Sequence, residues 1–389
     1  MLSASETHVD SNLMVSDNGG EVVLLTWAGG GGAKPVEAAA EDAYAALDGA
    51  LRERGCVPVQ ERAFGDLQAA PGMARGRAHA VGASPEWAVP TTYVEGAPVD
   101  RAGLSGIHVV GARGRSRVVA EGDHVYGRLV EGRTARVLGL ADVGRRATGR
   151  LAVGPAEDAA ATIEAAEELL AREGFSFRDV ARTWFYLRDI LDWYGPFNAV
   201  RNQAFRRMGL MGPGGGVQIP ASTGIEGRNA RGGWCALDLL ALQPRRGGGL
   251  EMRRLHNRKQ SEATEYGSAF ARAMEVQLED SRLIFVSGTA SIDDRGQTLH
   301  VGDFEAQTRH TLEAVSALLE GAGARLSDLR QATAFLKNPC DARAFDRILD
   351  RRGLRGVPLV TTVADVCREE LLFEIDGTAV LPLSSGARR

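Results

Sequence analysis

The sequence predicts an α/β protein built from two tandem copies of one unit, each a mixed β-sheet with two helices packed on one face. Three observations lead to this class: an internal repeat, apolar residues at helical spacing, and short β-branched or aromatic runs after them. The order strand, helix, strand, helix, strand places both helices against one face of a sheet. With 389 residues, the chain is long enough for about two domains of roughly 150–200 residues.

The repeat relates residues 151–190 to residues 299–338 at an offset of 148–149. Identical residues stand at equivalent places: Val153 and Val301, Gly154 and Gly302, Leu170 and Leu319, Gly174 and Gly323, Asp179 and Asp328, and Leu187 and Leu336. A duplicated unit is the simplest explanation of this pattern.

Each copy contains the same expected elements in the same order. The first is an amphipathic helix, with apolar residues at Ile163, Ala166, Leu169 and Leu170 in one copy and Leu312, Val315, Leu318 and Leu319 in the other. Gly174 and Gly323 follow, at the place where a left-handed glycine commonly ends a helix. The later elements are strand-like runs at 183–187 and 332–336, second helices at 197–209 and 341–353, and apolar runs at 359–366 and 371–381.

The first 104 residues are less regular. They contain the strand-like run VVLLTW at 22–27, a glycine tract at 29–32 and an alanine-rich helix expected at about 35–54. We divide the chain into an N-terminal extension (1–104), a first unit (105–245) and a second unit (246–389). Part of the extension is expected to complete the sheet of the first unit.

Composition excludes several classes of protein. The net charge is −4, so no overall positive field favours nucleic acid or an anionic membrane. The four cysteines form no CxxC pair and the seven histidines no HxH or HExxH motif, so neither a disulfide framework nor a metal site is expected. No stretch approaches the length of an apolar membrane span. We expect a cytoplasmic protein with a small-molecule substrate.

The run FVSGTASIDDRGQ at 285–297 and the closing run LLFEIDGTAV at 371–380 carry a resemblance to a known fold. Over about residues 253–385 the chain resembles the YjgF-like (reactive-intermediate deaminase), or chorismate-mutase-like, fold, and residues 105–244 match it more loosely. Units of this fold usually assemble as trimers. The resemblance therefore implies a homotrimer or a monomer with pseudo-trimeric packing, and it places most of the site in the second unit.

Two such units, with WYGPFNAVR at 193–201 and EYGSAFARA at 265–273, are similar to the chorismatase family, which removes the enolpyruvyl group of chorismate. In DVCREELLFEI, the resemblance implies that Glu374 is the acidic residue of the site. It also implies that Cys367 is the cysteine found in members that release 3-hydroxybenzoate.

Both residues also have plainer interpretations. Alternation along 371–380 turns Glu374 away from the face of Phe373 and Ile375, which suits either a solvent-exposed carboxylate or a site carboxyl. A buried glutamic acid with a raised pKa can protonate the terminal methylene carbon of an enol ether. A lone cysteine such as Cys367 is commonly a small core residue, and in a pocket it would exclude or steer water.

The resemblance also implies the groups that bind the substrate. Chorismate carries two carboxylates, for which Arg201 and Arg272 are the candidate clamps and Tyr194 and Tyr266 the accompanying hydroxyls. Most of the 43 arginines are expected to be surface residues. The small residues Gly288 and Ala290 would let a ligand approach the backbone.

The resemblance thus implies a chorismate-cleaving lyase or hydrolase that releases pyruvate and 3-hydroxybenzoate and needs no metal or organic cofactor. Two alternatives stay open. One is a tandem enzyme that acts on an enamine or imine intermediate as a deaminase or tautomerase. The other is a non-catalytic member of the fold that binds a small ligand.

Overall fold

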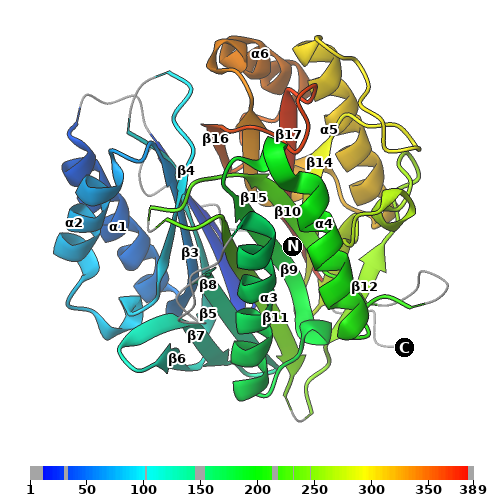
Figure 1. The fold of residues 1–389 in the computed structure, drawn as a ribbon. Coiled ribbons are helices and arrows are strands. Elements are labelled where there is room, and N and C mark those ends of the chain that lie inside the picture. Colours follow the sequence, from blue (N-terminus) through cyan, green and yellow to red (C-terminus); the bar gives the residue numbers. More distant parts are fainter. Residues whose placement is uncertain are drawn as a thin grey trace.

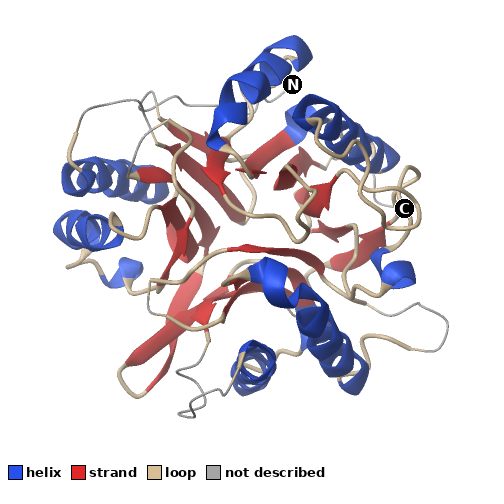
Figure 2. Cartoon of the chain, turned by 45° about the horizontal axis from the view of Figure 1, so that its top comes forward, coloured by secondary structure: helices blue, strands red, loops and turns tan. Residues whose placement is uncertain are grey.

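The computed structural model describes residues 12–29, 34–100, 103–144, 154–212, 218–230, 232–245 and 247–383. These residues form three mixed β-sheets whose strands lie toward the middle of the molecule, with the helices around the outside (Figure 1, Figure 2). The predicted α/β class is therefore confirmed. In addition to the two predicted units, a third sheet with two helices of its own is present.

The first sheet comes from the N-terminal part of the chain, in the strand order β1-β2-β5-β3-β4. Its strands are β1 (Leu13–Ser16), β2 (Val22–Ala28), β3 (Cys56–Gly65), β4 (Thr91–Glu95) and β5 (Leu104–Arg113). Its helices are α1 (Val36–Glu53), which agrees with the alanine-rich helix expected at 35–54, and α2 (Ala70–Val81).

The expected division at 104/105 falls at the start of β5, but this strand pairs with β2 and β3 of the first sheet. The segment expected to complete the sheet of the first unit therefore forms a sheet of its own. The physical reason is that β5 is almost wholly buried, so its apolar residues fit either sheet, and its partners are chosen by contacts far apart in sequence.

The second sheet has the order β10-β9-β11-β8-β7-β6. Its strands are β6 (Arg115–Glu121), β7 (His124–Glu131), β8 (Ala135–Val143), β9 (Val180–Leu187), β10 (Ala221–Glu226) and β11 (Cys235–Pro244). Its helices are α3 (Pro155–Arg172) and α4 (Ile190–Arg207). The helix α4 begins before the predicted residue 197, since a first turn precedes non-helical backbone at Trp193 (φ −146°, ψ 16°) and Pro196 follows inside the helix.

The third sheet has the order β12-β13-β14-β17-β15-β16. Its strands are β12 (Glu251–Leu255), β13 (Ala273–Gln277), β14 (Ser281–Ala290), β15 (Leu329–Leu336), β16 (Leu359–Val363) and β17 (Phe373–Pro382). Its helices are α5 (Phe304–Gly321) and α6 (Ala342–Arg352). The repeat predicted from the sequence appears as α3 with α5 and β9 with β15, and Gly174 (φ 76°) and Gly323 (φ 72°) are left-handed as expected.

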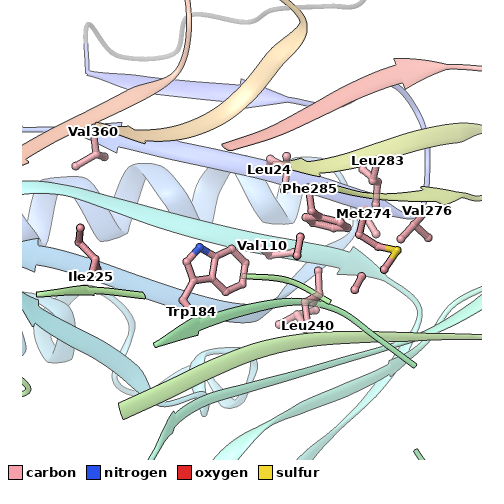
Figure 3. Close-up of a cluster of buried hydrophobic side chains, with 14 of the residues drawn as sticks. Leu24, Val110, Trp184, Ile225, Leu240, Met274, Val276, Leu283, Phe285 and Val360 are labelled. Atoms are coloured by element: carbon pink, nitrogen blue, oxygen red, sulfur yellow. The ribbon is translucent and has the colours of Figure 1, made fainter. Parts of the chain in front are cut away.

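A single hydrophobic core joins the inner faces of the three sheets. It includes Leu24 and Val110 from the first sheet, Trp184 and Leu240 from the second, and Met274 and Phe285 from the third (Figure 3). Apolar area removed from water is worth about 25 cal/mol per Å², so this shared core holds the three units together as one body.

Backbone hydrogen bonds join the sheets in pairs. The nitrogen of Glu95 donates to the carbonyl of Arg228 (2.9 Å), that of Val363 to Ala97 (2.9 Å) and that of Ala271 to Pro220 (3.0 Å). The strands β4, β16 and β10 thus lie at three equivalent joints. In the described part of the chain, no helix combines the length and the apolar character needed to cross a membrane.

Candidate active site

A pocket lies at the joint between the second and third sheets. All eight residues selected from the sequence line it: Tyr194, Arg201, Tyr266, Arg272, Gly288, Ala290, Cys367 and Glu374. Its empty volume is about 530 Å³, including the solvent at its mouth. The structure thus brings together residues from α4, β14, β17 and the segments before β13 and β17.

Glu374 reaches the pocket from β17 because side chains alternate along a strand. Its neighbours Phe373 and Ile375 point the other way, into the core beneath α5 and α6. Gly288 on the neighbouring strand β14 makes room for the carboxyl group, since a Cβ atom there would lie 2.1 Å from Oε1 of Glu374. Glu374 is therefore a pocket carboxyl, with only 4% of its surface exposed.

The surroundings of Glu374 favour its neutral form. The pKa of Glu374 is raised to about 8: burial is the largest cause, the negative charge of Asp376 adds to it, and Arg182 opposes both. Most of this carboxyl group is therefore protonated at pH 7, so Glu374 can donate a proton to a ligand in the pocket.

Two buried arginines face the same pocket. Arg201 donates to Oδ1 of Asn198 (2.7 Å) and Oγ of Ser222 (3.4 Å), and its Nε has no hydrogen-bond partner. Arg272 donates from Nε (2.8 Å) and Nη2 (2.6 Å) to the carbonyl oxygen of Ser261. Neither arginine takes part in an ion pair of 4 Å or less with an acidic side chain among the described residues.

An unpaired buried charge is costly, and it is seldom kept without a partner. Arg201 is 1% exposed and Arg272 is 2% exposed. Both also lie over aromatic rings: the guanidinium carbon of Arg201 is 5.5 Å from the ring centroid of Phe270, and that of Arg272 is 5.4 Å from that of Tyr266. The two side chains are thus held in fixed positions and offer positive charge to an anionic ligand.

The two tyrosines and the cysteine complete the wall around Glu374. Tyr194 stacks on Phe197 with ring centroids 6.0 Å apart. Burial raises the pKa of Tyr194 and of Tyr266, so both hydroxyls stay neutral and can donate hydrogen bonds. Burial, and then the charge of Glu374, raises the pKa of the Cys367 thiol to about 12. Cys367 is therefore a neutral thiol at pH 7 and is not set up as a nucleophile.

Sequence reasoning missed several residues of the pocket. Arg368 lines it and donates from Nη1 to the carbonyl oxygen of Gly296. Ser222 and Gly224 reach it from β10, and the ring of Phe270 lies close to both buried guanidinium groups, at 5.5 Å from that of Arg201 and 5.7 Å from that of Arg272. Arg368 stands next to Cys367 and could have been found from that motif. Nothing in the local sequence marks Ser222 or Gly224, since their strand meets the third sheet only through the tertiary fold.

No group of three histidine, cysteine, aspartate or glutamate side chains that could hold a metal ion occurs within the described ranges. The pocket itself combines three arginines with neutral hydrogen-bond donors. Such a set suits an organic anion, and the neutral Glu374 adds a proton donor beside it.

The sequence was compared with known proteins. The family model described as Endoribonuclease L-PSP matches residues 268–381. The chain is 30% identical over 235 residues to the 3-hydroxybenzoate synthase of Streptomyces hygroscopicus, in an alignment covering 54% of this chain and 65% of that protein. It is 36% identical over 66 residues to the 3-aminoacrylate deaminase RutC of Acinetobacter baylyi, covering 17% of this chain and 52% of that protein. The chain thus spans less than two thirds of the length of either relative.

The fold was compared with solved structures. A crystal structure of a chorismatase matches with a TM-score of 0.61 and 21% sequence identity, over 83% of this chain and 93% of that chain. At this identity the match concerns the fold alone, and a coverage of 83% of the chain means that it includes at least part of the first sheet. In sequence and in fold, the chain resembles the chorismatase family, and it carries a YjgF-like domain of the Endoribonuclease L-PSP type.

Proposed function

We propose that the protein cleaves chorismate to pyruvate and 3-hydroxybenzoate. The observation that carries the proposal is a neutral, buried Glu374 in a pocket with two buried arginines that have no acidic partner. The similarity to a 3-hydroxybenzoate synthase and the fold shared with a chorismatase support it.

Arg201 and Arg272 bind the two carboxylates of chorismate in this proposal. One carboxylate stands on the ring and the other on the enolpyruvyl group, so two separate cations can fix both ends of the molecule. Tyr194 and Tyr266 add hydroxyl donors beside the arginines. Closing the pocket around the ligand removes water and strengthens these charged hydrogen bonds.

Glu374 starts the reaction by donating its proton to the terminal methylene carbon of the enolpyruvyl group. The ether bond to ring carbon 3 then breaks as the oxygen of the 4-hydroxyl group attacks that carbon, and the pyruvyl group leaves as pyruvate. The bond from this oxygen to ring carbon 4 then breaks, and the hydrogen on carbon 3 leaves as a proton while the ring becomes aromatic. The oxygen gives up its own proton in the attack and regains one as the 3-hydroxyl group, so the net loss of one proton from the ring replaces the proton that Glu374 gave. No water is consumed, so the atoms of chorismate equal those of pyruvate and 3-hydroxybenzoate.

Cys367 steers this outcome by shielding the reacting carbon from water. Its neutral thiol is a weak hydrogen-bond partner and holds an ordered water poorly. With water kept away, the internal hydroxyl is the available nucleophile. If water reached the carbon that carries the ether oxygen, the product would be a non-aromatic dihydrodiol.

The proposal is tested by incubating the purified full chain with chorismate and separating the products by chromatography. Pyruvate with 3-hydroxybenzoate in equal amounts is the expected result, and Cys367→Ala should add dihydrodiol to the mixture. Absence of pyruvate would overturn the proposal. In that case, ammonia release from 2-aminoacrylate would point to an enamine or imine substrate, and binding without turnover to a non-catalytic member.

A further inference from the structure

The strand β14 carries a β-bulge beside Glu374. Its regular pairing with β17 is interrupted between Val286 and Thr289, and Ala290, just beyond the interruption, pairs with Glu374. Gly288 lies inside the bulge, at the place where an added Cβ atom would meet the carboxyl group of Glu374. Bulges often lie next to active sites, where they change the direction of a side chain or end a pairing. Here the bulge makes the room that this carboxyl group occupies.

No hydrogen bond from the protein holds that carboxyl group in place. Among the described residues, the groups that act on Glu374 are the surrounding core, Asp376 and Arg182, and none of them is a hydrogen-bond partner of its oxygens. The position of the carboxyl group therefore depends on its contact with Gly288, and so on whatever fixes the bulge.

Thr223 of β10 fixes the bulge from the second sheet. Its side chain is fully buried, and its Oγ1 atom makes three hydrogen bonds. It accepts from the backbone nitrogen of Gly288 (3.1 Å) and from Nη2 of Arg182, and it donates to Oδ2 of Asp376 (2.7 Å). A hydroxyl group can donate one hydrogen bond and accept two, so its capacity is fully used. One side chain thus holds both the bulge and the ion pair between Arg182 and Asp376 (2.9 Å).

Other bonds hold the residue before Gly288 independently. The backbone nitrogen of Ser222 donates to Oγ of Ser287 (2.8 Å), and the backbone nitrogen of Ser287 donates to the carbonyl oxygen of Arg272 (3.0 Å). Loss of the Thr223 hydroxyl should therefore release the peptide nitrogen of Gly288 while β14 stays attached to β10.

The joint between the first and second sheets shows the same arrangement without this dependence. By strand register, Thr92 of β4 has the place of Thr223, and Asp142 has the bulge position of Gly288. Thr92 donates to Oδ1 of Asp238 (2.6 Å). The backbone nitrogen of Asp142 donates directly to the same carboxyl group (2.8 Å). The threonine is thus needed to hold the bulge only beside Glu374.

We propose that Thr223 is a positioning residue for the reaction: by holding the backbone of Gly288, it keeps the carboxyl group of Glu374 where its proton reaches the substrate. The inference rests on the proposed function, in which Glu374 is the acid. A proton donor must lie within hydrogen-bond reach of the atom that it protonates. Thr223 is not among the residues that line the pocket, so it acts on turnover and not on binding.

The first experiment measures pyruvate release from chorismate by the wild type, Thr223→Val and Thr223→Ser. Valine keeps the shape of threonine but leaves the nitrogen of Gly288 buried without an acceptor. We expect Thr223→Val to lower kcat by about 10-fold or more, because a misplaced catalytic group is costly. Its KM should stay within about twofold, since Arg201 and Arg272 are unchanged. Thr223→Ser keeps the hydroxyl group and should retain kcat within about threefold.

The matched control is Thr92→Val, which removes the equivalent hydroxyl group from a buried aspartate at the other joint. Both valine variants should melt at a lower temperature than the wild type, but Thr92→Val should keep kcat within about twofold. An equal loss of kcat in the two valine variants would overturn the proposal, because the cause would then be general loosening. A Thr223→Val variant that changes KM alone, or a Thr223→Ser variant as slow as Thr223→Val, would also overturn it.

The second experiment compares crystal structures of the wild type and Thr223→Val, and it does not depend on turnover. In the wild type, Oγ1 of Thr223 should lie within about 3.2 Å of the nitrogen of Gly288. In the variant, the carboxyl group of Glu374 should be displaced by about 0.5 Å or more. A wild type without this bond, or a Glu374 that does not move in the variant, would overturn the proposal. A wild type that releases no pyruvate would overturn the proposed function instead, and the crystal structures would still show whether Thr223 positions Glu374.

Discussion

Two of the joints between sheets have equivalent strand arrangements, but one contains a pocket and the other is tightly packed. We call them the open joint and the closed joint. At the open joint, Glu374 of β17 is paired with Phe335 of β15, and the strand β10 lies beside them. At the closed joint, Gly106 of β5 is paired with Phe64 of β3, and the strand β16 lies beside them. Glu374 and Gly106 thus occupy equivalent places in the third and first sheets.

The residue that faces each of these positions also differs in polarity: it is polar beside Glu374 and apolar beside Gly106. Thr223 of β10 is equivalent to Val360 of β16 by strand register. Thr223 pairs with a residue of β9, and Val360 pairs with the equivalent residue of β15. Thr223 donates to Asp376 (2.7 Å) and accepts from the backbone nitrogen of Gly288 (3.1 Å), so polar groups surround Glu374. Val360 packs against Gly106 with no space between them. The two contacts between sheets therefore share the same strand pairing. A pocket forms where Glu374 and Thr223 meet, and a sealed contact forms where Gly106 and Val360 meet.

The largest expected effect comes from removing the proton donor at the open joint. We expect Glu374→Gln to lower kcat for chorismate cleavage by about 10² to 10⁴, the usual range for a general acid. The amide keeps the shape of the side chain but cannot donate the proton. Steady-state release of pyruvate measures the loss. Glu275→Gln, a change of another buried carboxyl in the same sheet, should leave kcat within about twofold.

A second change should turn the open joint into a closed one. A Cβ atom at Gly288 would lie 2.1 Å from Oε1 of Glu374 and 3.3 Å from Cγ2 of Thr223. Gly288→Ala should therefore displace the carboxyl group and lower kcat by about 10²-fold, as small displacements of a catalytic group do. Gly321→Ala at the end of α5, where an added Cβ meets nothing within 4 Å, is the control. Full activity of Gly288→Ala would show that Glu374 is not confined by β14.

A third prediction concerns the charge that keeps Glu374 neutral. In the proposed mechanism the acid form of Glu374 donates the proton, so kcat should fall as pH rises through about 8. Asp376→Asn removes a negative charge and frees Arg182, and both changes lower the pKa of Glu374. The fall in kcat should therefore move to lower pH, by about one unit.

The equivalent residue of the second sheet provides the control. Asp238 has the place in β11 that Asp376 has in β17, since each pairs with the matching residue of the strand beside it. Asp238→Asn should leave the pH profile of kcat unchanged because its charge acts at a different joint. A profile that moves equally in both variants would mean that general destabilisation, and not the charge of Asp376, sets the pH dependence.

Local patterns predicted the repeated parts of the molecule well. Helical spacing and the left-handed glycines gave α3 and α5, and the motif around Cys367 and Glu374 led to residues that the fold brings into one pocket. The grouping of β1 to β5 into a separate sheet was not predictable in this way. Strand pairing between residues far apart, such as Trp27 with Ile107, leaves no periodic signal in either segment. The contribution of β10 to the pocket was hidden for the same reason.

The smallest effect on activity is expected at the closed joint. A Cβ atom at Gly106 would lie 2.5 Å from Cγ2 of Val360 and 2.8 Å from the backbone oxygen of Trp27. Gly106→Ala should therefore lower the free energy of unfolding by about 1–3 kcal/mol through overpacking, while kcat stays within about twofold. Urea unfolding followed by tryptophan fluorescence measures the change. Adding Val360→Ala should recover part of the loss, because the oxygen of Trp27 remains in the way after the valine methyl groups are gone. If Gly106→Ala were as stable as the wild type, the closed joint would not be sealed by this contact, and the contrast with Glu374 would need another cause.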